Sequence, residues 1–205
     1  RPEPSPVPLN DINGIWPHCC PWLRNWIALT MWTALRLTDG MELQAQIGVQ
    51  LTGDSLRLVA SKTRHRHEYP IPQWLKTAWE PVTPPWTRST DFWRKTLREA
   101  ITYACRRTGV PEWTPKQLRQ RSITEWSRAN STAGTIIHGC GLGVLHHYLD
   151  PLQILEGAAP RVRLPECFGA SAEAGTEESL LHNFRRCDPS AQTLITGTAE
   201  RLAAG

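Results

Sequence analysis

The sequence has no hydrophobic run approaching the roughly 20 apolar residues that a transmembrane helix needs. Its opening residues, Arg-Pro-Glu-Pro-Ser-Pro, also lack the apolar stretch of a secretory signal peptide. These absences predict a soluble, intracellular protein with no membrane partner.

Paired cysteine motifs are lacking too, although the chain of 205 residues contains six cysteines. None is spaced as Cys-x-x-Cys, so we expect reduced thiols that mostly fill the core. A zinc site at His18, Cys19 and Cys20 is the alternative, but no matching second pair of ligands accompanies it. We therefore expect no metal ion and no cofactor. The cysteines are Cys19, Cys20, Cys105, Cys140, Cys167 and Cys187.

The net positive charge of the chain is small, and the excess of Lys and Arg is concentrated in the middle of the sequence. The net charge is only +4, yet the segment from Arg57 to Arg128 contains 15 Lys and Arg against 6 Asp and Glu. The remaining residues contain 8 Lys and Arg against 13 Asp and Glu. A basic middle between acidic flanks favours a polyanionic partner, and a solvated basic face is the alternative.

Helical patterns dominate the predicted secondary structure. The nearly continuous apolar run from Pro21 to Leu37 predicts a buried helix with Arg36 at its end. Periodicity, caps and prolines predict further helices over residues 72–79, 90–108, 114 onward, 151–158, 177–186 and 189–203. Residues 161–168 are expected to be extended.

Alternating apolar and polar residues predict a small sheet. Strands are expected at residues 47–51, 55–60 and 66–71. Lys62 then lies on the hairpin tip between the second and third strands, in the run Lys-Thr-Arg-His-Arg-His. The expected fold class is α+β, a largely helical core with a small antiparallel β-sheet on one edge.

The stretch over residues 114–151 carries residue types suited to chemistry on a phosphate. A Thr-Pro pair predicts a capped helix start, which places Lys116 and Arg119 one turn apart on the same side. His138 follows in a Gly-flanked segment, and Tyr148 comes just before an Asp-Pro helix start. Such residues on successive short helices can surround a phosphate and place a phenolic oxygen beside it.

This stretch resembles the catalytic core of the tyrosine recombinase, or phage integrase, family. The resemblance rests on Lys-x-x-Arg, then Ile-His-Gly, then His-His-Tyr. Upstream, Thr-Ala-Leu-Arg36-Leu-Thr-Asp39 is similar to the family's first-arginine motif, and Ser-Lys62-Thr is similar to its β-hairpin lysine. These landmarks span roughly residues 8–168 in the order that the family has them.

The resemblance implies that the chain cuts and rejoins DNA without a nucleotide or metal. Tyr148 would attack a backbone phosphate, form a 3′-phosphotyrosyl bond and release a 5′-hydroxyl, and an incoming 5′-hydroxyl would reverse the step. Arg36 and Arg119 would hold the nonbridging oxygens, and His138 would add a hydrogen bond. Lys62 would protonate the leaving hydroxyl.

The other implied site residues support this chemistry or contact DNA. Lys116 stands where the family more often has His, and it would donate to phosphate. Asp39 would orient a neighbouring side chain by hydrogen bonding, and His147 is a second supporting residue. The expected DNA-binding residues are Arg64, Arg66 and Arg121.

Two further features depart from the family pattern, one a spacing and the other a composition. The separation of Arg119 and His138 is shorter than is common, and a turn at Ala133-Gly134 is expected to accommodate it. The segment before Tyr148 is unusually rich in glycine.

The resemblance also divides the chain and suggests its partners. Residues 1–8 are expected to be a linker remnant, residues 9–168 the catalytic domain and residues 169–205 a helical tail. Family members usually carry a DNA-clamping domain before the core, so the chain is expected to be a fragment or to lack that domain. The partners implied are double-stranded DNA and further subunits in a tetrameric synapse, which the tail would join unless it packs on its own core. The implied location is the prokaryotic cytoplasm or nucleoid.

Two other functions remain open. A type IB topoisomerase shares this constellation of residues, and a decayed, non-catalytic relative would bind DNA without cutting it. A covalent protein–DNA adduct separates the enzymes from the binder, and strand exchange between two sites separates a recombinase from a topoisomerase.

Overall fold

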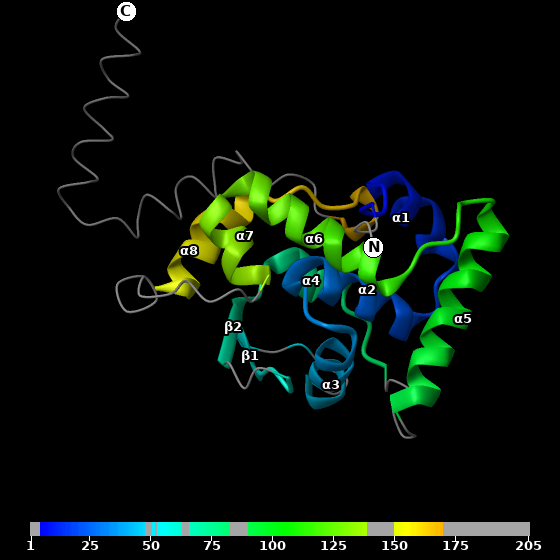
Figure 1. The fold of residues 1–205 in the computed structure, drawn as a ribbon, viewed down its shortest axis with the longest axis horizontal. Coiled ribbons are helices and arrows are strands. Elements are labelled where there is room, and N and C mark those ends of the chain that lie inside the picture. Colours follow the sequence, from blue (N-terminus) through cyan, green and yellow to red (C-terminus); the bar gives the residue numbers. More distant parts are fainter. Residues whose placement is uncertain are drawn as a thin grey trace, which may run out of the picture. The chain divides into compact units, whose positions relative to one another are not determined.

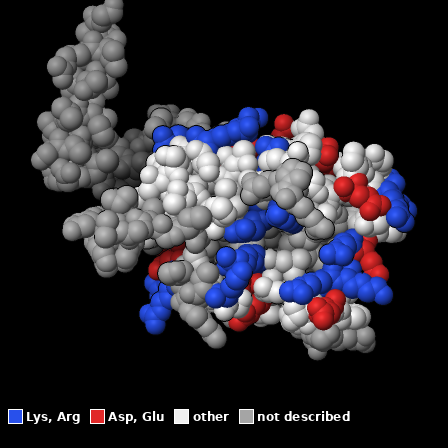
Figure 2. All heavy atoms as spheres, in the orientation of Figure 1, with Lys and Arg blue, Asp and Glu red and all other residues white. Residues whose placement is uncertain are grey.

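Helices make up most of the computed structural model, which describes residues 5–47, 51, 53–62, 66–82, 90–138 and 150–169 (Figure 1). The helices are α1 (Leu9–Ile15), η1 (Trp16–His18), α2 (Pro21–Thr33), α3 (Leu37–Ile47), α4 (Gln73–Ala78), α5 (Thr90–Thr108), α6 (Pro115–Ala129), α7 (Ser131–His138), α8 (Pro151–Ala158), η3 (Ala159–Arg161) and η4 (Glu166–Phe168). Strands β1 (Ser55–Val59) and β2 (Arg66–Pro70) form one antiparallel sheet. A mostly helical fold with a small antiparallel sheet is therefore confirmed. Charged side chains of both signs are scattered among uncharged residues on the face drawn in Figure 2.

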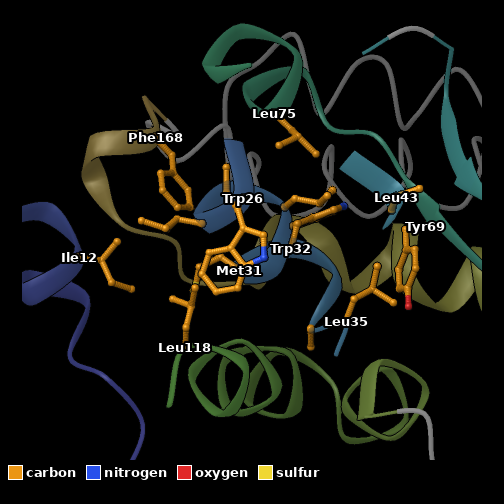
Figure 3. Close-up of a cluster of buried hydrophobic side chains, with 14 of the residues drawn as sticks. Ile12, Trp26, Met31, Trp32, Leu35, Leu43, Tyr69, Leu75, Leu118 and Phe168 are labelled. Carbon is orange, nitrogen blue, oxygen red and sulfur yellow. The ribbon is translucent and has the colours of Figure 1, made fainter. Parts of the chain in front are cut away.

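Helix α2 forms the centre of the fold because its sequence is almost entirely apolar. Figure 3 shows Trp26, Met31 and Trp32 within a cluster that also takes residues from α1, α4 and α6. The Trp32 indole N–H donates to the Pro70 carbonyl of β2 at 2.6 Å, and the Trp126 indole N–H of α6 donates to the Trp32 carbonyl at 2.8 Å. These two bonds fix the sheet and α6 against α2. Among the described helices, none combines the length and apolar character needed to cross a bilayer.

The end of α2 differs from the sequence expectation of a helix reaching Leu37. α2 stops at Thr33, and Ala34 adopts a left-handed conformation with φ of 47° and ψ of 27°. A left-handed residue commonly ends a helix, but it is usually glycine. The chain then turns, and α3 begins at Leu37. Arg36 therefore lies in the connection between two helices rather than at the end of one.

The β1–β2 hairpin confirms the expected strands on either side of Lys62. Leu56 pairs with Tyr69 and Leu58 pairs with His67, and Leu56, Leu58 and Tyr69 are buried. The strand expected at residues 47–51 is wrong at its start, because Ile47 is the last residue of α3. Residues 48–50 lie outside the described part of the chain.

Helices α6 and α7 form a tight antiparallel pair. The Thr114 side chain accepts from the Gln117 N–H and the Gln117 side chain accepts from the Thr114 N–H, so the expected cap is confirmed. A single residue, Asn130, separates α6 from α7, and its side chain caps α7. The expected turn at Ala133-Gly134 is wrong, since both residues lie inside α7. Gly134 faces Ser127 of α6 so closely that a side chain has no room there.

The remaining described elements agree with most of the sequence expectations. Helices α4, α5 and α8 form where they were predicted, and the Asp150 carboxylate caps α8. Residues 161–168 are less extended than expected, since η3 ends within them and η4 closes them. Val7 is buried and its N–H donates to the Gln117 carbonyl at 3.4 Å, so this part of the expected linker is anchored to α6. The tail helices predicted after Gly169 lie outside the described residues.

The close approach of α7 to α6 generates a stability prediction at Gly134. A Cβ atom there would lie 2.7 Å from the Ser127 Cα, so Gly134→Ala must push the helices apart. We expect a loss of about 1–3 kcal/mol in the free energy of unfolding, measured by urea denaturation followed by circular dichroism. Gly157→Ala in α8 is the matched control, because no heavy atom lies within 4 Å of its added Cβ. That change should be neutral or stabilising by up to about 1 kcal/mol. Equal effects of the two changes would contradict the packing argument.

Candidate active site

The candidate site is built around Arg119 of α6. Its Nε donates to the carbonyl of Ala34 at 2.7 Å, and its Nη2 donates to the carbonyl of His138 at 3.1 Å. Ala34 ends α2 and His138 is the last residue of α7, so both carbonyls lie at helix ends. A cation at such ends also complements the helix dipole. One guanidinium therefore joins the ends of two helices to α6.

The short interval between Arg119 and His138 follows from the tight α6–α7 pair. Because α7 reverses direction after one residue and packs closely through Gly134, its last turn comes back beside the first half of α6. No longer connection is needed to bring the two residues together. The interval that departs from the family pattern is thus compatible with a contact between Arg119 and the backbone of His138.

Asp39 connects α3 to the hairpin that carries Lys62. Its side chain is buried, with 1% of the residue exposed, and Oδ1 accepts from the Ser61 N–H at 3.1 Å and from the Ser61 hydroxyl at 2.6 Å. Lys62 is the next residue and is exposed. The neighbour that Asp39 holds is therefore Ser61, which fixes the backbone immediately before the candidate acid.

Tyr69 of β2 lies between these two arrangements, and the sequence analysis missed it. It is 2% exposed, and its ring stacks on His67 with centroids 5.9 Å apart. Burial raises the pKa of the phenol, the Asp39 carboxylate raises it further, and the Arg119 guanidinium opposes the shift. Figure 3 shows the phenol oxygen pointing toward helices α6 and α7. Tyr69 is thus a neutral phenol that packs between the hairpin and α6, and strand alternation with Leu56 opposite was the signal that marked it as inward-facing.

The side chains of the other described candidate residues are at least partly exposed. Arg36 is half-buried, and its carbonyl accepts from the Gly40 N–H at 2.8 Å at the start of α3. Lys116, in the first turn of α6, and His138 are exposed, as is Arg66 at the start of β2. Figure 2 shows Lys and Arg atoms gathered in the middle of the face between α6 and α3.

Arg121, which is expected to bind DNA, makes two contacts within the protein. Its Nε donates to the Val7 carbonyl at 2.6 Å and its Nη1 pairs with the Glu125 carboxylate at 2.8 Å. Its side chain is only 16% exposed. These bonds anchor the N-terminal segment to α6, and a role of Arg121 in DNA binding stays a prediction. Arg64, His147 and Tyr148 lie outside the described residues.

The described cysteines, Cys19, Cys20, Cys105 and Cys167, are free thiols. Burial raises the pKa of the Cys19 and Cys167 thiols to about 12, so neither is a ready nucleophile. Within the ranges that the structure describes, no group of three His, Cys, Asp or Glu residues could hold a metal ion.

Comparison with known proteins gives no independent assignment. No family model matches the chain, and neither a curated protein nor a solved structure shows significant similarity to it. Function must therefore be argued from the site itself.

The buried contact between Asp39 and Ser61 generates a prediction about coupling. In a double-mutant cycle with Asp39→Ala and Ser61→Ala, we expect an interaction free energy of about 1–3 kcal/mol, because the bond joins a hydroxyl to a buried carboxylate. The measurement is the free energy of unfolding of the four proteins in urea. The matched control is Ser55 with Glu68, which form a 2.6 Å bond on the outer face of the same hairpin. Solvent should reduce the coupling of that pair to below about 1 kcal/mol. The tie is refuted if the Asp39 cycle gives no more coupling than this control.

Proposed function

We propose that this chain is a tyrosine recombinase-like enzyme that cuts and rejoins double-stranded DNA through a 3′-phosphotyrosyl intermediate. The observation that carries the proposal is the bridging of Ala34 and His138 by Arg119. The bridge gathers Arg119, the backbone of His138 and the segment leading to Arg36, three landmarks that are far apart in the sequence.

The site is suited to stabilising negative charge on a phosphate. Arg119 donates to two backbone carbonyls, which orient a planar group that carries five N–H donors. Arg36 follows Ala34 by two residues, so its backbone lies close in the chain to the carbonyl that Arg119 binds. Preorganised donors of this kind stabilise charge that develops in a transition state, because they need no reorganisation during the reaction. His138 is proposed to add a hydrogen bond, and Lys116 a further contact to phosphate.

Tyr148 is the proposed nucleophile because the other two tyrosines are poorly suited. Tyr69 is buried and its pKa is raised. Tyr103 is 60% exposed, but it lies on α5, which Figure 1 shows well apart from α7, α8 and the hairpin. In the sequence, Tyr148 precedes Asp150, the N-cap of α8, by two residues. Helix α8 packs against both β2 and α7, the elements that follow Lys62 and end at His138.

The proposed reaction forms a bond between the Tyr148 oxygen and phosphorus and breaks the bond from phosphorus to the 5′-oxygen. The phenol gives its proton to solvent water, and the leaving oxygen receives one from Lys62. The tie from Asp39 to Ser61 supports this role, since it fixes the backbone that carries the lysine. His147 is proposed to support the nucleophile, while Arg64 and Arg66 would contact the DNA backbone. Self-association through the C-terminal tail and a prokaryotic cytoplasmic location belong to the same proposal.

Trapping on nicked suicide DNA tests the nucleophile. We expect Tyr148→Phe to retain DNA binding but to form no covalent adduct, because phenylalanine lacks the attacking oxygen. The adduct is measured as a protein band of reduced mobility in a denaturing gel. Tyr103→Phe is the matched control and should form adduct at the wild-type level. An adduct in the Tyr148→Phe protein, or its loss in the Tyr103→Phe protein, would reject the assignment. Wild-type binding without any adduct would favour the non-catalytic relative.

A sulfur substitution in the DNA tests Lys62. With a bridging 5′-sulfur, the leaving group needs no proton, so Lys62→Ala should lose about 10²-fold or more on normal DNA but regain most of its rate on the sulfur substrate. Lys76→Ala is the control, because Lys76 lies on α4 and pairs with Asp54 at 3.5 Å. Its cleavage rate should stay near wild type on both substrates. Equal impairment of Lys62→Ala on both would place the acid elsewhere, with Lys116 as the first candidate.

A further inference from the structure

A pocket of about 600 Å³ lies beside Lys62, between α3, the β1–β2 connection and the start of α5. Figure 1 shows the beginning of α5 next to α3. Its volume is within the range of roughly 300–1,000 Å³ that is typical of small-ligand sites. The lining residues are Thr38, Glu42, Ala45, Ser61, Thr90 and Trp93.

The lining suits a flat, uncharged ring that carries hydrogen-bond donors. The half-buried indole of Trp93 offers an aromatic surface, and the hydroxyls of Thr38, Ser61 and Thr90 offer polar contacts around it. The carboxylate of Glu42 accepts hydrogen bonds from an amine and would repel a phosphate. The nearest candidate for a phosphate contact is instead Lys62, which follows Ser61 and is exposed outside the lining.

We propose that this pocket receives one unpaired nucleobase with an exocyclic amine from the bound DNA. The inference rests on the proposed function, because it assumes that Lys62 contacts the DNA backbone next to that base. Stacking on Trp93 would offset the cost of unstacking the base, and Glu42 would accept from its amine. Thymine, which has no exocyclic amine, is the base that the pocket discriminates against.

Ser61 links the pocket to the candidate site. It lines the pocket, and both its N–H and its hydroxyl are bonded to Asp39. A base that contacts Ser61 would therefore touch the same residue that positions the backbone of Lys62. Occupation of the pocket and placement of the proposed acid are thereby coupled through one side chain.

The test compares the affinity of the full chain for two short duplexes of one sequence, one fully paired and one with a single bulged adenine. The wild-type protein should prefer the bulged duplex by about fivefold or more, the lower end of the effect of stacking one base on an aromatic side chain. A bulged thymine should keep the contribution of stacking but bind more weakly than the bulged adenine, because it has no exocyclic amine from which Glu42 can accept. Ala45→Phe fills the pocket and should bring the ratio close to one without changing the affinity for the paired duplex. Trp93→Phe keeps an aromatic ring and should retain most of the preference.

Tyr103→Ala is the matched control, since Tyr103 is an exposed aromatic residue of α5 that does not line the pocket. It should leave the ratio unchanged. A wild-type ratio of one, with normal binding of the paired duplex and normal adduct formation, would overturn the pocket and leave the proposed function standing. A preference that survives Ala45→Phe, or that disappears with Tyr103→Ala, would also overturn it. Failure of the wild-type protein to bind either duplex would reject the pocket and the proposed function together.

Discussion

The arrangement of the candidate site depends on one charged group that satisfies two helix ends. The Arg119 guanidinium donates to the carbonyls of Ala34 and His138, which lie at the ends of α2 and α7. Hydrogen bonds from a charged donor are stronger than neutral ones, typically contributing about 1.5–3 kcal/mol. The same contacts that stabilise the ends of α2 and α7 therefore fix the position of a residue suited to bind phosphate. The same atoms of Arg119 stabilise the fold and serve the proposed function, so a substitution of Arg119 should be assessed for both the free energy of unfolding and the DNA cleavage rate.

The contact between Arg119 and Ala34 is held in place because α2 is buried and is itself hydrogen-bonded to the elements around it. The Ser122 hydroxyl of α6 donates to the Met31 carbonyl at 2.6 Å, one turn along α6 from Arg119. With the bond from the Trp126 indole to the Trp32 carbonyl, this gives α2 and α6 two fixed contacts, and the Trp32 indole joins α2 to β2. Sliding of α6 along α2 would break these bonds inside the core, where lost partners are costly. Arg119 therefore holds its place relative to Ala34 through the packing as well as through its own contact.

Local signals in the sequence predicted much of the fold but not the contacts that build the site. The Thr114 cap, α5, α8 and the β1–β2 hairpin depend on residues close together in the chain, so their patterns were readable. The end of α2 could not be predicted in this way, because Ala34 adopts a conformation that usually belongs to glycine and its residue type does not indicate it. Gly134 looked like a turn because glycine often marks one, whereas its function is to let α7 approach Ser127. The bonds of Arg119, and the position of Tyr69 near Asp39, involve segments far apart in the sequence. Strand alternation indicates that Tyr69 faces inward, but periodicity does not indicate which distant residue it meets.

The buried Asp39 constrains how the hairpin can take part in a reaction. A hairpin tip that carries a lysine suggests a mobile arm, yet Ser61 is held by two bonds to a carboxylate that is almost fully buried. Moving Ser61 would leave that carboxylate without these donors, which is unfavourable for a buried charge. The hairpin is therefore anchored at Ser61, and adjustment of Lys62 is left mainly to its own long side chain. A lysine side chain spans enough rotamers to follow a leaving oxygen without moving the backbone. A fixed backbone with a flexible amine suits proton transfer, because it limits the search for the oxygen while keeping the last step adjustable.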